Sequence, residues 1–115
     1  MDDWTLDIRV AGVSIRQEAV RCVRIGDWLA CVAEPQNPHD RNAVGLWRVD
    51  ARGRVLDGGH VGYVPRDTAM AIAYMLGDGW ECWAHALEVT GGSDECPTTG
   101  LRVRLRRRRV AEKKG

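Results

Sequence analysis

The chain has 115 residues, the commonest size of a single domain, which predicts one core and no second catalytic lobe. Apolar residues make up 44% and charged residues 29% of the chain, a globular composition that excludes intrinsic disorder and a collagen-like repeat. No apolar run approaches the roughly 18 residues of a membrane span. The first residues lack the basic and apolar regions of a signal peptide, so we expect a cytoplasmic protein.

The net charge of +1 conceals a strong asymmetry along the chain. Residues 102–115 hold eight of the 17 basic residues and one of the 16 acidic residues, so this segment carries +7 and the remainder −6. Such segregation favours contact of the segment with phosphate. A biased genomic base composition is the alternative, because Arg outnumbers Lys fifteen to two.

The first three elements expected in chain order are a strand, a short helix and a strand. Residues 4–10 alternate polar and apolar side chains, the pattern of a half-buried strand. Residues 17–25 have apolar residues at helical spacing and stop before Gly26, which predicts a short helix. Residues 28–33 form an apolar run, and the following Pro35 favours extended geometry.

A loop, a hairpin and the main helix are expected next. Residues 35–42 are rich in residues that form Asx-turns and fix φ, so they predict a loop. Residues 43–49 and 55–64 flank a turn and predict a hairpin. A helix should open at Pro65 and end at Leu76, where a glycine follows.

The last elements complete a sheet. Residues 80–89 and 101–105 predict two strands that are joined by a surface loop. Five or six short strands, one main helix and one short helix predict an α+β, β-rich fold, a small OB-like or SH3-like barrel. We assign residues 1–105 to this domain and residues 106–115 to a basic C-terminal tail.

The four cysteines are unevenly spaced and form no C-x-x-C pair, which argues against a disulfide framework or a zinc ribbon and favours buried free thiols. Cys82 and His85 come closest to a metal pair, but their offset of three places them on opposite faces of a strand. We therefore expect no cofactor, and a metal at Cys82, His85 or Cys96 remains the alternative.

The sequence contains none of the common catalytic motifs. It has no G-x-x-x-x-G-K-[ST], G-x-G-x-x-G, H-E-x-x-H or G-x-S-x-G, and no carboxylates at a spacing that indicates an acid–base pair or a nuclease metal site. This favours a binding module over an enzyme.

One segment carries a family signature. Residues 34–44, Glu-Pro-Gln-Asn-Pro-His-Asp-Arg-Asn-Ala-Val, resemble the EPxNPYDxNAV signature of the HIRAN domain family, whose members occur alone in bacteria and phages. The flanks agree in order, with residues 10–13 upstream, Gly26-Asp27 before the second strand and residues 62–66 before the main helix. The resemblance covers roughly residues 6–90.

The resemblance implies a fold and a function. HIRAN domains are OB-like barrels, found alone or fused to helicases and nucleases, and in one DNA-repair translocase the domain captures the free 3′-hydroxyl end of single-stranded DNA. For this chain the resemblance implies a non-enzymatic module that binds single-stranded DNA or 3′ ends in DNA repair or processing. The alternative is an adaptor that docks on a separate helicase or nuclease.

The resemblance also implies site residues in the signature loop. Asp40 matches the acidic residue beside the terminal sugar, where a carboxylate accepts a hydrogen bond from a hydroxyl and repels a phosphate. His39 stands where the family usually has a Tyr that stacks on a base. Arg66 matches a basic residue that contacts phosphate. Alternatively, Asn37 and Asp40 tie the loop together through hydrogen bonds to its backbone, and Arg66 is a plain surface residue.

The resemblance departs from the family just after the first strand. Ser14 and Ile15 stand where the end-binding members have an Arg and an aromatic residue. Arg16 can supply the cation from two positions along, and the alternative is a solvated Arg at a helix start.

Aromatic and basic residues outside the signature add further candidates. We expect Trp4 and Trp28 to pack in the core, Tyr63 to pack against the main helix, and Trp47 and Trp83 to be exposed stacking surfaces. Three arginines alternate along one face of the last strand at about 6.8 Å, a row that can follow a phosphate backbone. They are Arg102, Arg104 and Arg106. The alternative is an edge strand that charge protects from aggregation.

Overall fold

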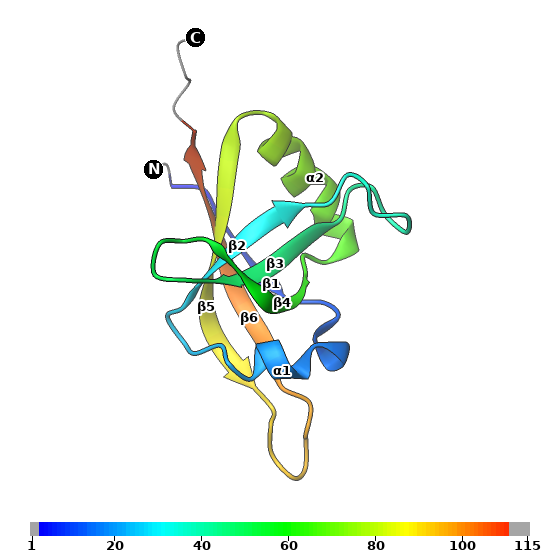
Figure 1. Ribbon diagram of the computed structural model, residues 1–115, viewed down its shortest axis with the longest axis vertical. Helices are drawn as coiled ribbons and strands as arrows, with labels where there is room; N and C mark the ends of the chain where they lie inside the picture. The colour runs from blue at the N-terminus through cyan, green and yellow to red at the C-terminus, as the bar shows by residue number, and fades with distance from the viewer. Residues whose placement is uncertain (1–2, 111–115) are drawn as a thin grey trace.

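The computed structural model describes residues 3–110, which form one six-stranded antiparallel sheet and two α-helices. The strands are β1 (Thr5–Arg9), β2 (Trp28–Ala33), β3 (Val44–Val49), β4 (Val55–Tyr63), β5 (Trp80–Thr90) and β6 (Gly100–Arg109). Their order in the sheet is β1-β6-β5-β2-β3-β4. In Figure 1 the long strands β5 and β6 run along the vertical axis, and β2 and β3 cross them. The predicted β-rich, OB-like class is confirmed.

The two edge strands of the sheet are drawn together by one backbone bridge. Ala11, just after β1, exchanges two hydrogen bonds with Tyr63 at the end of β4, each with an N···O distance of 2.9 Å. Gly62 allows this approach, because a Cβ at that position would lie 2.3 Å from the carbonyl oxygen of Ala11. The sheet therefore curls back on itself, and Tyr63 is placed where it closes.

The main helix α2 (Arg66–Gly77) begins directly after Pro65, as expected, and packs Ala69 and Ile72 into the core. The helix predicted over residues 17–25 is much shorter in the structure, where α1 spans only Gln17–Val20. A 3-10 turn (Val13–Ile15) precedes it. The helix α1 ends early because the carboxylate of Asp27 accepts the backbone N–H of Arg24 and holds a turn there. Within residues 3–110, neither helix has the length and apolar character needed to cross a membrane.

The core consists of the inward-facing residues of the strands together with α1 and α2. In β6, Leu101, Val103 and Leu105 are fully buried, while the arginines between them face outward, as the alternation predicts. Each fully buried leucine contributes about 1.5–3 kcal/mol relative to an exposed one. The core therefore fixes which face of each strand points outward.

The last strand is longer than predicted, since it continues to Arg109 instead of ending at Leu105. The first residues of the expected tail thus pair with β5, as far as Trp80 opposite Arg109, and residues 111–115 lie outside the described part of the chain. On its other side β6 pairs with β1, from Arg102 to Arg106. The edge-strand explanation of the arginine row is therefore wrong.

Two of the tryptophan predictions need revision. Trp4 packs against the core as expected, but Trp28 is 42% exposed and stacks on His85, with ring centroids 4.6 Å apart. The reason is the strand alternation, because Leu29 takes the inward position of β2 and turns Trp28 outward. Trp47 and Trp83 do point outward but are half-buried.

The four cysteines are free thiols in this structure. Cys82 is buried as expected, whereas Cys22 and Cys96 are exposed. Cys82 faces the core and His85 faces outward, so the predicted opposite placement is correct. A hydrogen bond with Cys82 and burial raise the pKa of the Cys31 thiol well above its usual value. Among residues 3–110, no three His, Cys, Asp or Glu side chains are grouped as a metal site would require.

Candidate nucleic-acid interface

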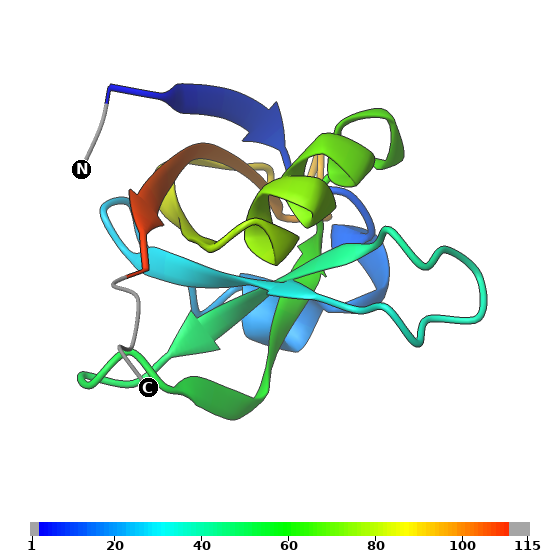
Figure 2. The same ribbon diagram turned by 90° about the horizontal axis from the view of Figure 1, so that it is seen from above.

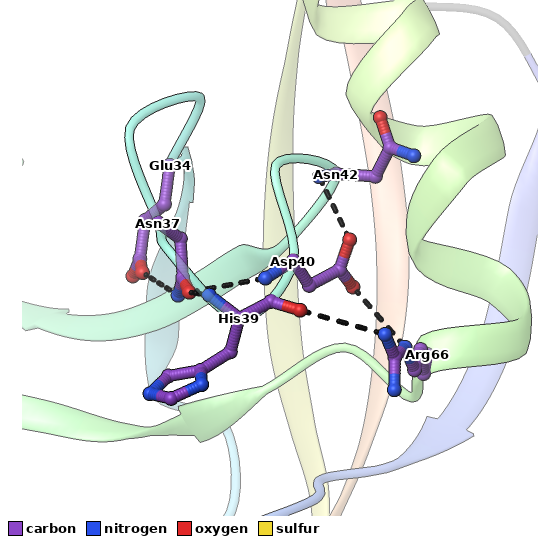
Figure 3. A network of polar contacts seen from close by, with 6 residues as sticks. All are labelled: Glu34, Asn37, His39, Asp40, Asn42 and Arg66. Carbon is purple, nitrogen blue, oxygen red and sulfur yellow. Dashed lines mark hydrogen bonds and ion pairs between the residues drawn. The ribbon is translucent and has the colours of Figure 1, made fainter.

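The loop between β2 and β3 is held together by its own side chains (Figure 3). The side-chain oxygen of Asn37 accepts the backbone N–H groups of His39 and Asp40 at 2.9 and 3.2 Å, and its amide nitrogen donates to Glu34 at 2.9 Å. One carboxylate oxygen of Asp40 accepts the backbone N–H of Asn42 at 2.9 Å. Asn37 and Asp40 therefore do tie the loop, and this bonding gives it a defined shape as it extends from the domain (Figure 2).

Arg66 connects this loop to the start of α2. Its Nε lies 3.7 Å from Oδ2 of Asp40, and its Nη2 lies 3.5 Å from the carbonyl oxygen of His39. The Arg66 side chain is 79% exposed. An exposed ion pair of this kind contributes less than about 1 kcal/mol, so the guanidinium is only weakly held. The imidazole of His39 is exposed and directed away from these contacts (Figure 3).

The loop, the end of β4 and the start of α2 enclose a pocket of about 330 Å³. We call it the loop pocket. It is lined by Ala11, Arg16, Asn37, His39, Asp40, Ala43, Tyr63, Val64 and Arg66. The structure thus brings together five of the site residues that the sequence suggested, from segments far apart in the chain.

Arg16 stands at the start of α1, as the alternative interpretation had it, but its half-buried side chain lines this pocket. Its Nη1 donates to the carbonyl oxygen of Gly12 at 2.9 Å, and its guanidinium lies over the ring of Tyr63, 5.2 Å from the centroid. Ser14 and Ile15 line an adjoining hollow of about 410 Å³ instead, which Arg16 also borders. Ile15 is 79% exposed there.

Sequence reasoning missed the side chains behind Arg16. Tyr63 turns its ring towards Arg16 and His60, and its hydroxyl donates to Glu34 at 3.0 Å. The ring of His60 meets Tyr63 edge-on and stacks on Trp47, with centroid distances of 4.8 and 4.6 Å. The bridge with Ala11 turns Tyr63 to this side of the sheet. Pairing of that kind leaves no signal in the local sequence.

Gly45 in β3 leaves room for the cluster of Glu34, Trp47 and His60. Its position inside a strand was a signal for this cluster that the sequence did contain. A Cβ on Gly45 would lie 2.7 Å from Oε2 of Glu34, 3.0 Å from Nε1 of Trp47 and 3.2 Å from Nε2 of His60. A glycine inside a strand indicates close approach by other groups. Here it allows three side chains to converge over the sheet.

The protonation of the cluster follows from its contacts. Burial, and then the charge of Arg16, lower the pKa of His60 below its ordinary value of 6.5. The neutral ring accepts the Nε–H of Arg16 on Nδ1 at 3.3 Å and donates from Nε2 to the carbonyl oxygen of Gly62 at 3.0 Å. Burial and the bond to Glu34 raise the pKa of Tyr63, which keeps its hydroxyl a donor.

The arginine row of β6 is not part of the loop pocket. Arg104 binds Asp7 through two nitrogens, at 2.7 and 3.0 Å, and lowers the pKa of that carboxyl. Arg102 lies 3.6 Å from Asp7 and 3.4 Å from Glu88. Two of the three arginines are therefore already paired with carboxylates.

A curled OB-like sheet with a polar loop pocket at its closure defines a class of small binding domain. The HIRAN domain family matches residues 5–106. This chain belongs to the HIRAN domain family, whose members are DNA-binding domains and not catalytic by themselves.

Two solved structures share the fold. A crystal structure of a protein from Lactobacillus plantarum has 17% identity and a TM-score of 0.63, over 90% of this chain and 97% of that one. The crystal structure of the HIRAN domain of human HLTF has 20% identity and a TM-score of 0.59, over 88% of this chain and 74% of that one. No curated protein matches the sequence significantly.

Proposed function

We propose that this domain binds single-stranded DNA in the loop pocket, with a preference for a free 3′ end, and serves DNA repair or processing without catalysis or a cofactor. The observation that carries the proposal is the convergence of Arg16, His39, Asp40 and Arg66 on one pocket in a member of a DNA-binding family. Arg16 and Arg66 supply cations for phosphate, Asp40 supplies an acceptor for a hydroxyl, and His39 supplies a ring for a base.

The charges in the pocket suit a phosphate followed by a terminal hydroxyl. Arg16 and Arg66 line the pocket together with Asp40. Phosphate contacts to such arginines position a strand without reading its sequence. Within residues 3–110, the Oδ2 of Asp40 meets only the exposed Arg66, at 3.7 Å, so it has capacity to accept a hydrogen bond from a terminal hydroxyl. Base-specific recognition is not part of the proposal.

Stacking is the second component. The exposed imidazole of His39 presents a flat ring at the pocket, although with less area than a tyrosine. Ile15, at the position where end-binding relatives have an aromatic residue, offers an exposed aliphatic surface in the adjoining hollow. We expect weaker base stacking here than two aromatic rings would give.

The test is fluorescence anisotropy with a labelled single strand, a blunt duplex and a single strand with a 3′-phosphate, each at two salt concentrations. We expect the single strand with a free hydroxyl to bind most tightly and to weaken steeply with salt. Arg16→Gln with Arg66→Gln should weaken all binding, whereas Arg24→Gln, at an exposed arginine outside both site hollows, should not. Equal and salt-independent binding of the three ligands contradicts the proposal.

A second candidate is an adaptor for a separate helicase or nuclease. It is favoured by α2, which exposes Tyr74 at 72% and Met70 at 53%. Tyr74 also lines a hollow of about 920 Å³ between α2 and Trp80. Apolar contact with a protein would show little salt dependence, and Tyr74→Ala would weaken it without changing DNA affinity.

A further inference from the structure

A second pocket lies on the outer face of the sheet, over β2, β5 and β6. Its volume is about 340 Å³, and its main side chains are Trp28, Trp83, Glu81, Arg106 and Arg108, with the turn of the β3–β4 hairpin beside them. We call it the sheet pocket. It shares no lining residue with the loop pocket.

Two indole rings make up its apolar part. In the register of β2 and β5, Trp28 lies opposite His85 and Ala30 lies opposite Trp83, so both tryptophans are on the outer face. Trp28 is 42% exposed and backed by the stacked ring of His85. The hairpin turn approaches Trp83, since a Cβ on Gly53 would lie 3.3 Å from Cη2 of that ring. A flat ligand can therefore contact preformed aromatic surface.

Among the described residues, Arg106 forms no ion pair beside the indoles, whereas Arg108 does. Glu81 lies opposite Arg108 in the sheet and forms an ion pair with it. Arg106 lies opposite Trp83, and its Nε is buried with no hydrogen-bond partner within the described chain. A buried donor without a partner is costly and needs an explanation. An anionic group bound at this pocket would compensate the charge of the Arg106 guanidinium.

The outer face also connects the two pockets. Ala30 lies opposite Trp83 on one side and opposite Trp47 on the other, so the two tryptophans share one row across the sheet. Two strand spacings separate them, about 10 Å. Trp47 stacks on His60, which bonds to Arg16 of the loop pocket. Ala30, between the two indoles, is only 9% exposed, so neighbouring side chains cover it.

We propose that the sheet pocket binds a further nucleotide of the same single strand, with the base against Trp28 and Trp83 and the phosphate on Arg106. This inference rests on the proposed function, because it extends the strand that the loop pocket holds. Aromatic rings and cations together are the means by which proteins bind single strands without reading sequence. The distance of about 10 Å between Trp47 and Trp83 corresponds to about three nucleotides, at about 3.4 Å per stacked nucleotide.

The experiment compares a two-nucleotide and a twelve-nucleotide thymidine strand, both with a free 3′-hydroxyl, by competition anisotropy. Only the longer strand should reach the sheet pocket. We expect Trp28→Ala to weaken the twelve-nucleotide strand about tenfold, which corresponds to ~1.4 kcal/mol, and to leave the two-nucleotide strand unchanged. Trp28→Tyr should restore most of the affinity, and Arg106→Gln should lower the salt slope for the longer strand by about one.

The matched control is Tyr74→Ala, which removes an exposed aromatic ring from α2, outside both pockets. Unchanged binding of the long strand by Trp28→Ala and Arg106→Gln overturns the sheet pocket while the proposed function stands. An equal loss for both lengths also overturns it, because a length-independent effect reports a disturbed fold. If the wild-type protein binds neither strand, the proposed function fails, and the sheet-pocket proposal fails with it.

Discussion

Replacement of Asp40 by asparagine separates the two roles that its carboxylate combines. Oδ1 accepts the backbone N–H of Asn42, and an asparagine retains an oxygen for that bond. Oδ2 faces the pocket beside Arg66 and carries the charge that would repel a terminal phosphate. Asp40→Asn therefore keeps the loop and removes the negative charge, whereas Asp40→Ala loses both.

The magnitude follows from the chemistry of the contact. A hydrogen bond to a charged group contributes roughly 1.5–3 kcal/mol, about tenfold to a hundredfold in affinity. The side chain of Asp40 is 23% exposed, so water competes and the lower part of this range applies. We expect a 3′-hydroxyl strand to bind about tenfold more tightly than a 3′-phosphate strand, and we expect Asp40→Asn to reduce this ratio towards one.

The assay is anisotropy with the two ends on otherwise identical strands, together with thermal unfolding of each variant. Asp40→Asn should unfold at nearly the wild-type temperature, and Asp40→Ala should unfold lower. Equal affinity of the folded wild-type protein for both ends would refute end recognition. A ratio that survives in the folded Asp40→Asn variant would show that another group reads the end.

The remaining predictions concern the fold and the charges. Gly62→Ala should lower the unfolding temperature, because its Cβ would overlap a carbonyl oxygen at 2.3 Å, whereas Gly77→Ala, with open space around it, should be neutral or stabilising; equal effects would contradict the closure of the sheet. Because the pKa of His60 is depressed in the folded state, its contribution to stability is present above pH 6.5 and is lost as the pH falls through the folded-state pKa. His60→Asn should therefore flatten this part of the curve of stability against pH, and an unchanged curve would contradict the assignment to His60. Arg104→Gln, at an arginine bound to Asp7 through two nitrogens, should weaken DNA binding less than Arg66→Gln; the reverse order would place phosphate on Arg104 instead of Arg66.

The local sequence determined those helices and strands that have a single apolar face. Strict alternation in β6 predicts that Leu101, Val103 and Leu105 are inward, and they are fully buried. Pro65 and the following apolar stripe predict α2 and its start. The signature in residues 34–44 identifies the loop and its polar residues. In each case the deciding interactions lie within a few residues of one another along the chain.

The tertiary structure decided those features that depend on pairing between strands far apart in the sequence. Periodicity assigns side chains to two faces of a strand but does not say which neighbours cover each face. Pairing of Thr5 with Arg106 makes β6 an interior strand, and the bridge from Ala11 brings Tyr63 to the loop pocket. Trp28 faces outward because Leu29 occupies the core position beside it. These outcomes depend on contacts between segments far apart in sequence, whose geometry no local pattern records.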